Sequence, residues 1–327
     1  MDLSNNYDKG MRLKRYSVYF LTLFVLFVIW KLSVIEDGVD KLQLLREALE
    51  LHKEKLQLSQ QQLLLLEHLE SNRGSNNNDH ANHPVIYAVT PTYARLVQKA
   101  ELTRISQTLM LVPNVHWIVI EDSEKKTDLV RNLISESKLV ATHLNAKTPP
   151  FEQLKDKDPR WKRHRGVEQR NMALKWLREN FQPKRGKGIV YFMDDDNTYS
   201  IKVFKEIEKV KKVGVWPVGL VGGLNAEAPI IDPETGKVTG YKSGWKPNRP
   251  FAIDMAGFAI SLDLILEKQE AQFSYMMEKG LQESEFLSYF TTKEELEPLA
   301  DNCTKVYVWH TRTEKPTITG IVPGLEV

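Results

Sequence analysis

An apolar run at residues 189–193, Ile-Val-Tyr-Phe-Met, leads directly into three consecutive aspartates, Asp194, Asp195 and Asp196. Such a run, rich in β-branched and aromatic side chains, is typical of a buried strand. Three adjacent carboxylates repel one another unless a cation lies between them, and oxygen-rich clusters of this kind suit Mg²⁺ or Mn²⁺. The pattern predicts a divalent-metal site at a strand end; the alternative is a solvated turn in which Asn197 caps the next helix.

Apolar runs of strand length alternate with segments of helical periodicity upstream of this triplet. The runs lie at residues 85–89, 117–120, 140–144 and 189–193, and the helical segments lie at residues 94–111 and 166–179. A turn is expected at residues 90–92, after the first run. The alternation predicts an α/β domain with a mostly parallel sheet. Ligands of such sheets lie beyond the carboxyl ends of the strands, where Thr92, Tyr93 and Asp122 are expected beside the triplet.

The second half of the domain has a different pattern. Residues 216–224 are apolar and glycine-rich, residues 232–237 form a turn between two extended pieces, and residues 251–262 are apolar around one acid, Asp254. We expect this half to be more antiparallel and to hold a second substrate. The domain, residues 84–327, is therefore divided into residues 84–197 and 198–327.

The amino-terminal part predicts a membrane anchor. Residues 16–35 form a twenty-residue apolar run whose only charge is Lys31. A helix rising about 1.5 Å per residue would cover roughly 30 Å, the thickness of a bilayer core. Basic residues precede the run and acidic residues follow it, so residues 1–15 are expected to be cytosolic and the rest lumenal. An uncleaved anchor is favoured over a cleaved signal peptide, because no small-residue cleavage site follows.

A stem is expected between the anchor and the domain, at residues 36–83. Leucines recur every seven residues within residues 41–70, at Leu42, Leu49, Leu56 and Leu63. This spacing predicts a helix that either pairs two chains or stands alone as an amphipathic helix. Residues 71–83 are polar and unpatterned, which is typical of a flexible linker.

Composition excludes some alternatives. The chain has 45 Lys and Arg residues and 43 Asp and Glu residues, and the net charge of +2 gives no overall attraction for nucleic acid. Cys303 is the only cysteine, so an intrachain disulfide is impossible. It lies in Asn302-Cys303-Thr304, which is either an N-glycosylation acceptor or a chance match.

Basic side chains lie close to the predicted strand ends. Lys162, Arg163, His164 and Arg165 precede a helix that contains Arg170, and His310 and Arg312 follow the last strand. Arginine forks and helix amino ends suit phosphates, although a solvated basic loop is the alternative. A sugar transfer to a hydroxyl also needs a carboxylate base. The candidates are Glu227, Asp254 and Glu283, and spacing does not choose among them.

Six stretches together resemble the β-1,3-glucuronosyltransferase family, glycosyltransferase family 43. They are YAVTPTYARLVQKAELTR, RGVEQRN, YFMDDDNTYS, WPVGLVGGL, RPFAIDMAGFA and VWHTRTEKP, and they span about residues 84–316. The resemblance implies a GT-A-type fold, in which a Rossmann-like nucleotide-binding half joins an acceptor-binding half. It also implies a single-pass type II protein of the Golgi membrane that acts as a homodimer with Mn²⁺.

The resemblance also implies residue roles. Those implied to bind the donor UDP-glucuronate are Tyr93, Asp122 and Arg165 at the uracil base, Asp195 at the ribose, and Arg170, His310 and Arg312 at the phosphates and the glucuronate. Asp196 is implied to bind Mn²⁺ with the diphosphate, and Asp194 is expected to orient its neighbours. Those implied to hold the acceptor sugars are Glu227, Trp245, Arg249 and Asp254. Glu283 matches the catalytic base, and Lys279 stands where family members often carry arginine, which puts that donor contact in doubt.

The activity implied by the resemblance is an inverting transfer of glucuronate to the 3-hydroxyl of a terminal galactose. Within the family, most of the motifs and Trp245 favour the Gal-Gal-Xyl linkage region of proteoglycans as acceptor. The stretch Gln282-Glu283-Ser284 instead resembles members that act on N-acetyllactosamine. Two further hypotheses are a Golgi sugar-binding protein without turnover and a metal-dependent phosphohydrolase.

Overall fold

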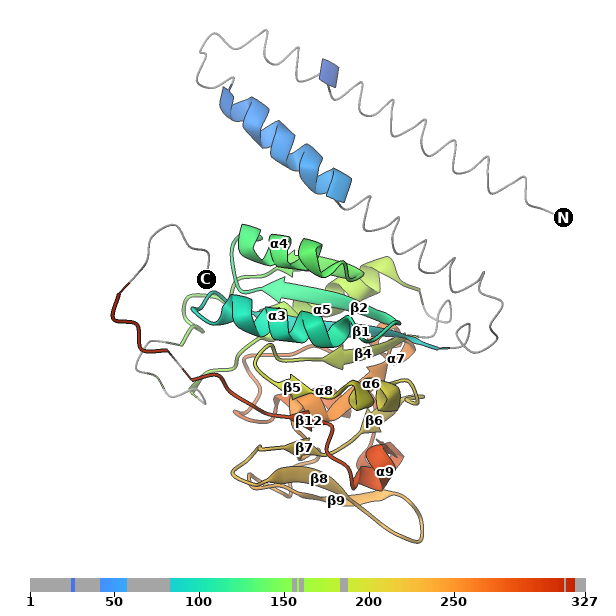
Figure 1. Cartoon of the computed structure of the whole chain (residues 1–327). Helices are drawn as coiled ribbons and strands as arrows, with labels where there is room; N and C mark the ends of the chain where they lie inside the picture. The colour runs from blue at the N-terminus through green and yellow to red at the C-terminus, as the bar shows by residue number, and fades with distance from the viewer. Residues whose placement is uncertain are drawn as a thin grey trace, which may run out of the picture. The chain divides into compact units, whose positions relative to one another are not determined.

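The computed structural model describes residues 25–26, 42–57, 83–154, 158, 162–182, 188–314 and 316–320. The chain divides into two compact units, residues 1–70 and 71–327 (Figure 1). Residues 42–57 of the first unit are helical. The rest of the expected stem helix, the linker at residues 71–82, and the anchor at residues 16–35 apart from Val25 and Leu26 lie outside the described residues. In the part of the chain that is described, no helix is long and apolar enough to cross a membrane.

A sheet organises the second unit, and within the described residues it has seven strands in the order β11-β6-β10-β4-β1-β2-β3. The strands are β1 (Val85–Thr92), β2 (Val115–Glu121), β3 (Ala141–Asn145), β4 (Gly188–Phe192), β6 (Val213–Val215), β10 (Phe258–Ser261) and β11 (Glu297–Pro298). Neighbours among β3, β2, β1 and β4 are parallel, whereas β10 is antiparallel to both β4 and β6. The predicted α/β domain with a mostly parallel sheet is therefore confirmed.

The prediction of a turn at residues 90–92 is wrong, because β1 continues to Thr92. The pairing of β1 with β4 ends at Val89, but its pairing with β2 continues to Thr92, opposite Glu121. Beyond Val89 the strand has one paired edge, and a proline, which lacks an N–H, is tolerated there. Pro91 therefore does not end the strand.

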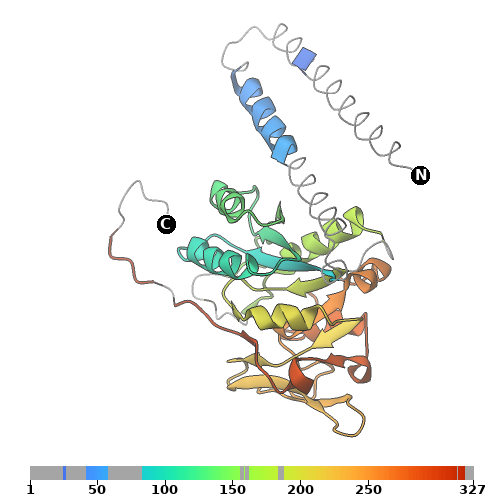
Figure 2. The same cartoon turned by 45° about the vertical axis from the view of Figure 1, so that its right-hand side comes forward.

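Helices cover both faces of this sheet (Figures 1 and 2). On one face lie α3 (Gln98–Leu109), α4 (Asp128–Ser137) and α6 (Ile201–Ile207), and on the other lie α5 (Val167–Asn180), α7 (Leu262–Glu267) and α8 (Gln282–Ser288). Alternate residues of β1 point to the two faces: Ile86 and Ala88 pack with the first set, and Tyr87 and Val89 with the second. The helical segment expected at residues 94–111 begins later, at Gln98, and Leu96 precedes α3 and is exposed.

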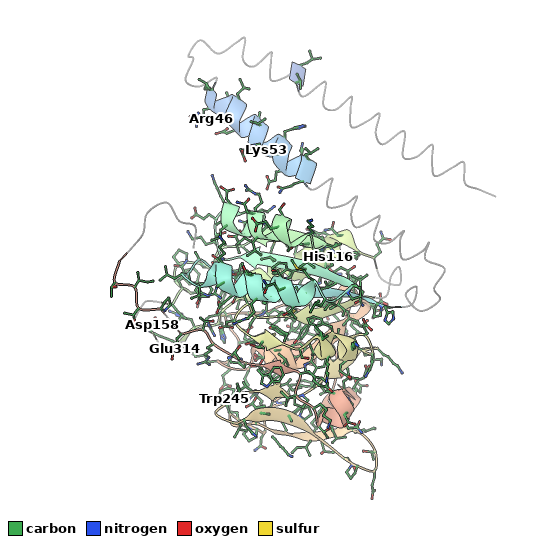
Figure 3. All side chains as sticks on the ribbon, viewed as in Figure 1. Arg46, Lys53, His116, Asp158, Trp245 and Glu314 are labelled. Carbon is green, nitrogen blue, oxygen red and sulfur yellow. The ribbon has the colours of Figure 1, made fainter. Side chains whose placement is uncertain are left out.

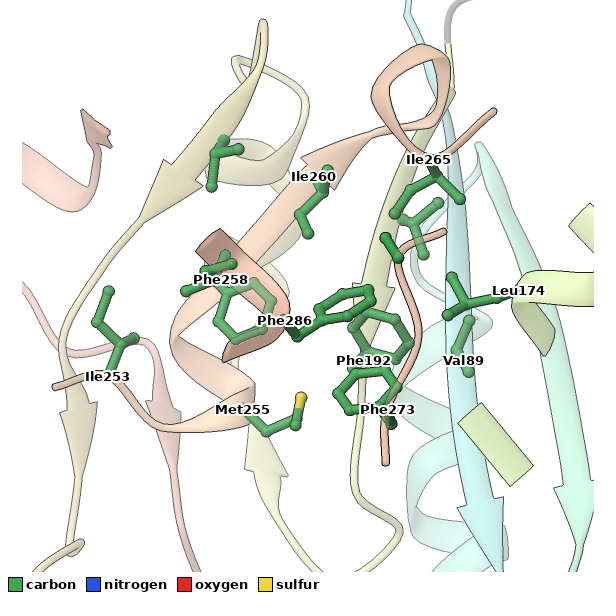
Figure 4. Packing of buried hydrophobic residues seen from close by; sticks show 14 of the residues in the cluster. Val89, Leu174, Phe192, Ile253, Met255, Phe258, Ile260, Ile265, Phe273 and Phe286 are labelled. Atoms are coloured by element: carbon green, nitrogen blue, oxygen red, sulfur yellow. The ribbon is translucent and has the colours of Figure 1, made fainter. Parts of the chain in front are cut away.

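Aromatic side chains link the end of β4 to α8 (Figure 4). The rings of Phe273 and Phe286 stack with centroids 4.1 Å apart. Phe192, the last residue of β4, meets both rings edge-on, at 5.4 Å from Phe273 and 5.6 Å from Phe286. The aspartate triplet begins two residues after Phe192, and Phe286 lies in the same helix as Glu283. This cluster therefore fixes the triplet relative to the candidate base.

A smaller sheet lies beside the first, and its described strands have the order β5-β12-β7-β8-β9. They are β5 (Thr198–Tyr199), β12 (Val308–Trp309), β7 (Val218–Gly219), β8 (Ala226–Ile231) and β9 (Val238–Lys242). The turn expected at residues 232–237 is confirmed, since Gly236 N donates to Asp232 O at 2.8 Å between the antiparallel β8 and β9. Short helical turns complete the half: η3 (Met255–Gly257), η4 (Lys293–Glu295) and α9 (Ala300–Cys303).

We predict that Phe286→Ala lowers the free energy of unfolding by about 3–5 kcal/mol, because it leaves a cavity inside the aromatic cluster. Denaturant unfolding monitored by fluorescence measures this loss. The matched control is Phe151→Ala, whose side chain is 72% exposed and whose loss should change the midpoint little. Equal effects of the two variants would contradict the structural role given to the cluster.

Candidate functional site

The first two aspartates of the triplet are each paired with an arginine. Asp194 Oδ1 accepts a hydrogen bond from Arg170 Nη2 at 2.7 Å. Asp195 accepts one from Thr92 Oγ1 at 2.7 Å and forms an ion pair with Arg95 Nη2 at 2.7 Å. Burial raises the pKa of Asp195 to about 6, even though Arg95 and Thr92 oppose the shift. The end of β4 thus combines carboxylates with the cations that stabilise them.

Asp196, the third aspartate, is held through its backbone. Its carbonyl oxygen accepts hydrogen bonds from Arg104 Nη2 at 2.9 Å and Thr311 Oγ1 at 2.7 Å. Among the described residues, no group hydrogen-bonds or ion-pairs with its carboxylate. Burial, followed by the negative charges of Asp194 and Glu101, raises the pKa of Asp196. Of the three carboxylates, this one is placed to accept an additional cation.

The residues present fit a metal that is shared with a ligand. No group of three His, Cys, Asp or Glu side chains suited to a metal ion occurs in the described part of the chain. Mg²⁺ and its relatives commonly use one or two carboxylates together with waters and substrate phosphates. Asp196 could supply the protein ligand of such a shell, and phosphate oxygens and water could supply the rest.

Arg95 is a site residue that the sequence interpretation missed. Its guanidinium pairs with Asp195 and Glu101 and lies 4.4 Å from the centre of the Tyr93 ring. Burial lowers the pKa of Arg95, but the two carboxylates outweigh this and raise it overall. The available signal was its position just after Thr92 and Tyr93 at a strand end. Arg95 joins the triplet to the aromatic ring expected at the nucleotide base.

The end of β2 carries two carboxylates that each anchor a loop. Asp122 accepts hydrogen bonds from both Thr148 N and Thr148 Oγ1 at 2.7 Å. Glu121 accepts from Thr127 N at 2.8 Å and from Thr127 Oγ1 at 2.7 Å. Tyr93, which directly follows the neighbouring β1, is 46% exposed, so its ring retains surface for a planar ligand.

Only part of the predicted basic cluster faces the triplet. Lys162 pairs with Asp158, Arg163 pairs with Glu152, and His164 Nε2 lies 2.8 Å from Met277 O. By contrast, the positive charge of Arg165 acts to lower the pKa of Asp196. Arg170 is therefore the member that contacts the triplet, through Asp194, and Arg165 acts on it through its charge alone.

Gly166 lets Arg170 reach the triplet. It precedes α5 with a φ of +71°, and a Cβ at this position would collide with the Arg170 guanidinium. Arg170 Nη1 donates to Arg165 O at 2.8 Å while Nη2 binds Asp194. A glycine is needed here both for the left-handed backbone and for the close approach.

A histidine–carboxylate pair lies beside the candidate base. His310 Nδ1 and Asp254 Oδ2 are 3.2 Å apart, and Asp254 Oδ1 accepts from Ala256 N at 2.9 Å. The hydrogen bond with Asp254 raises the pKa of His310. Burial would raise the pKa of Asp254, but the bond and charge of His310, together with Ala256 N–H and Arg170, hold it below its usual value. Burial, then repulsion from Asp254, raises the pKa of Glu283 to about 7.

Three of the residues expected at the acceptor, Glu227, Trp245 and Arg249, lie on β8 or in the segment after β9, whereas Asp254 lies at the start of η3. Glu227 is 5% exposed, and its Oε1 accepts from Ser243 Oγ at 2.7 Å and Gly244 N at 3.0 Å. Trp245 is 40% exposed beyond the end of β9 (Figure 3). The guanidinium of Arg249 lies 5.0 Å from the centre of its ring.

Three further features concern the surface around this group. The Trp245 ring lies so close to Gly280 that a Cβ there would collide with it. Lys279 is exposed, and no described residue pairs with its ammonium group. Asn302 is exposed on α9.

A family model described as glycosyltransferase family 43 matches residues 105–314. The chain is 56% identical over 236 residues to "Galactosylgalactosylxylosylprotein 3-beta-glucuronosyltransferase I" of Drosophila melanogaster, an alignment that covers 71% of this chain and 77% of the relative. It is 53% identical over 242 residues to "Galactosylgalactosylxylosylprotein 3-beta-glucuronosyltransferase 3" of Homo sapiens, covering 71% and 72% of the two chains. A solved structure, "Crystal structure of S. aureus TarS 1-349 in complex with UDP-GlcNAc", is 15% identical with a TM-score of 0.44 over 70% of this chain and 59% of that one.

We predict that Asp254→Asn lowers the pKa of His310, because the hydrogen bond to a carboxylate is what raises it. NMR titration of the imidazole in the metal-free chain measures the shift. The stability that the raised pKa of His310 contributes is present below the unfolded-state pKa of histidine, as long as Asp254 is ionised, and is lost as pH rises through the raised pKa. The control Asp301→Asn alters an exposed aspartate on α9 and should leave the titration of His310 unchanged. An unchanged His310 pKa in Asp254→Asn would refute the assigned cause.

Proposed function

The chain belongs to glycosyltransferase family 43, and we propose that it transfers glucuronate from UDP-glucuronate to the 3-hydroxyl of a terminal galactose, with inversion. The proposed acceptor is the Gal-Gal-Xyl linkage region of proteoglycans. The names of relatives 53% and 56% identical to this chain, which refer to galactosylgalactosylxylosylprotein, support this choice. The parallel sheet with strand-end carboxylates and the smaller sheet beside it support a GT-A-type division into donor and acceptor halves.

The observation that carries the proposal is that three carboxylates differ in their partners and in their pKa. Glu227 is occupied by Ser243 and Gly244, and Asp254 is held ionised by His310. Glu283 has no side-chain partner among the described residues, and burial brings its pKa to about 7. A general base works best when its pKa is close to the working pH. Of the three candidates, we therefore assign the base to Glu283.

The reaction is a single displacement. Glu283 accepts the proton of the acceptor 3-hydroxyl while that oxygen forms a bond to C1 of the glucuronate. The bond from C1 to the β-phosphate oxygen breaks on the opposite face, and its electrons leave with UDP. The products are the glucuronosylated acceptor, UDP with the electrons of the broken bond, and Glu283 with the proton of the hydroxyl. Attack from the opposite face inverts the anomeric centre.

We assign the donor site to the groups at the strand ends. Tyr93, Asp122 and Arg165 hold the base, and Asp195, fixed by Arg95 and Thr92, is directed to the ribose. Arg170, His310 and Arg312 face the phosphates and the glucuronate, and Asp194 orients Arg170. Mn²⁺ bound at Asp196 would stabilise the charge that develops on the diphosphate. Lys279, exposed and carrying a point charge, would bind the donor less specifically than an arginine fork.

The acceptor site is assigned to Glu227, Trp245, Arg249 and Asp254. A half-exposed indole stacks well on the apolar face of a sugar, and carboxylates accept hydrogen bonds from its hydroxyls. Residues 16–35 are proposed as the anchor of a type II Golgi membrane protein, with residues 36–327 in the lumen. We further propose that the chain is a homodimer and carries a glycan on the exposed Asn302.

We predict that Glu283→Gln abolishes transfer, because an amide accepts no proton, while the affinity for UDP stays unchanged. Initial rates and calorimetric titration with UDP measure the two properties. The matched control is Glu285→Gln in the same helix α8, where no hydrogen bond or ion pair between the carboxylate and a described residue is lost. Transfer by Glu283→Gln at a rate close to that of the control would eliminate Glu283 as the base.

We also predict that kcat/KM for the acceptor rises as pH increases through about 7, the pKa of Glu283, because the base must be ionised. Asp254→Asn removes a negative charge near Glu283 and should therefore move this rise in kcat/KM to lower pH. A pH profile at saturating UDP-glucuronate measures both effects. If kcat/KM of Asp254→Asn rose at the same pH as that of the wild-type chain, the electrostatic coupling of the two carboxylates would be contradicted.

A further inference from the structure

The segment between α7 and α8 leads directly to the candidate base. Residues 268–281, all of which the structure describes, contain neither helix nor strand, and Glu283 lies in the first turn of α8. Within this segment Ala271 and Phe273 are buried. A buried segment outside a helix or sheet has no regular backbone partners, so side chains must supply its hydrogen bonds. These side chains therefore help to fix where α8 begins.

Two side chains of α5 bind the backbone of this segment. Arg178 Nη2 donates to Lys268 O and to Ala271 O, each at 2.8 Å. Asn171 binds Phe273 through both ends of its amide: Nδ2 donates to Phe273 O, and Oδ1 accepts from Phe273 N, each at 2.8 Å. The amide of Asn171 thus pairs with both backbone groups of one residue, as a neighbouring strand does in an antiparallel sheet.

Phe273 and Ser274 contact α8 on both sides of Glu283 in the sequence. The ring of Phe273 stacks on that of Phe286 with centroids 4.1 Å apart (Figure 4). Ser274 O accepts a hydrogen bond from Gln282 Nε2 at 2.7 Å. Gln282 directly precedes Glu283, and Phe286 lies about one turn further along the same helix. The position of residues 273 and 274 therefore determines where the candidate base lies.

We propose that Asn171 is a positioning residue for the general base. By fixing the backbone of Phe273, it holds the first turn of α8 where Glu283 can reach the acceptor hydroxyl. The proposal rests on the proposed function, since that function makes Glu283 the base. Asn171 directly follows Arg170, which is assigned to the donor phosphates. Its side chain therefore links α5, which carries a donor residue, to the helix of the base.

The test compares Asn171→Ala with the matched control Asn180→Ala in the full chain. Asn180 is an exposed residue of the same helix, and its Nδ2 donates to Trp176 O within that helix at 2.8 Å. In Asn171→Ala, kcat should fall about 100-fold, because a displacement of about 1 Å at a reacting group can cost that much. KM for UDP-glucuronate and the calorimetric affinity for UDP should not change. Asn180→Ala should behave as the wild-type chain does.

A second readout does not depend on transfer. Carbon NMR follows the titration of the Glu283 carboxyl in the metal-free chain, and the signal is identified by its absence from Glu283→Gln. Burial, followed by the charge of Asp254, raises the pKa of Glu283 to about 7. A displaced α8 that admits water should therefore lower this pKa in Asn171→Ala. Asn180→Ala should leave it unchanged.

Gln282→Ala breaks the contact at the other end, between Ser274 and α8. This second variant keeps the proposal testable if Asn171→Ala does not fold. It should also lower kcat and the pKa of Glu283 without changing the affinity for UDP. Since both variants act through residues 273 and 274, the loss of kcat in the double variant should be smaller than the product of the two single losses.

The role of Asn171 would be overturned by an unchanged kcat, by a loss of UDP affinity as large as the loss of kcat, or by an unchanged pKa of Glu283. It would also be overturned if Gln282→Ala changed neither kcat nor that pKa, or if the two variants acted independently. If the wild-type chain transfers no glucuronate, the proposed function is overturned, and the titration of Glu283 still decides the role of Asn171.

Discussion

Three consecutive carboxylates at the end of β4 repel one another. The site therefore depends on nearby cations that compensate their negative charge. Arg170 binds Asp194, and Arg95 binds Asp195, each at 2.7 Å. Both arginines reach the triplet through local backbone features: Arg170 folds back over Gly166, and Arg95 follows the strand end of β1. Removing either cation would leave a largely buried carboxylate uncompensated, which is costly. The remaining carboxylate, that of Asp196, is the one to which we assign the metal.

Charge compensation also distinguishes Asp254 from Glu283, the two carboxylates that we assign near the acceptor. Asp254 is stabilised as an anion by His310, and its charge then acts on Glu283, where it adds to burial in raising the pKa to about 7. The aromatic cluster of Phe192, Phe273 and Phe286 holds α8 against β4. The groups that we assign to the donor and to the acceptor therefore belong to one packed core, which keeps the candidate base in a fixed place relative to the triplet.

Much of the fold could be predicted from local pattern, because the strands before residue 194 are short apolar runs that alternate with helices. The extension of β1 through Pro91 could not be predicted in this way, since it depends on which neighbouring strand ends first. The part played by Arg95 and the choice among Glu227, Asp254 and Glu283 could not be predicted from local pattern either. These depend on contacts between residues far apart in sequence, such as Ser243 with Glu227 and His310 with Asp254. The family resemblance pointed to Glu283, and the burial and partners of the three carboxylates now give a physical reason for that choice.

The central claim is that these groups form one site for transfer to a galactose at the end of the linkage trisaccharide. The most direct measurement incubates the chain with UDP-glucuronate and Mn²⁺ and with either Gal-Gal-Xyl or N-acetyllactosamine, and follows both UDP release and product mass. We expect UDP and glucuronosylated Gal-Gal-Xyl to appear in equal amounts, with slower transfer to N-acetyllactosamine. UDP release without a glucuronosylated product, or a preference for N-acetyllactosamine, would contradict the account.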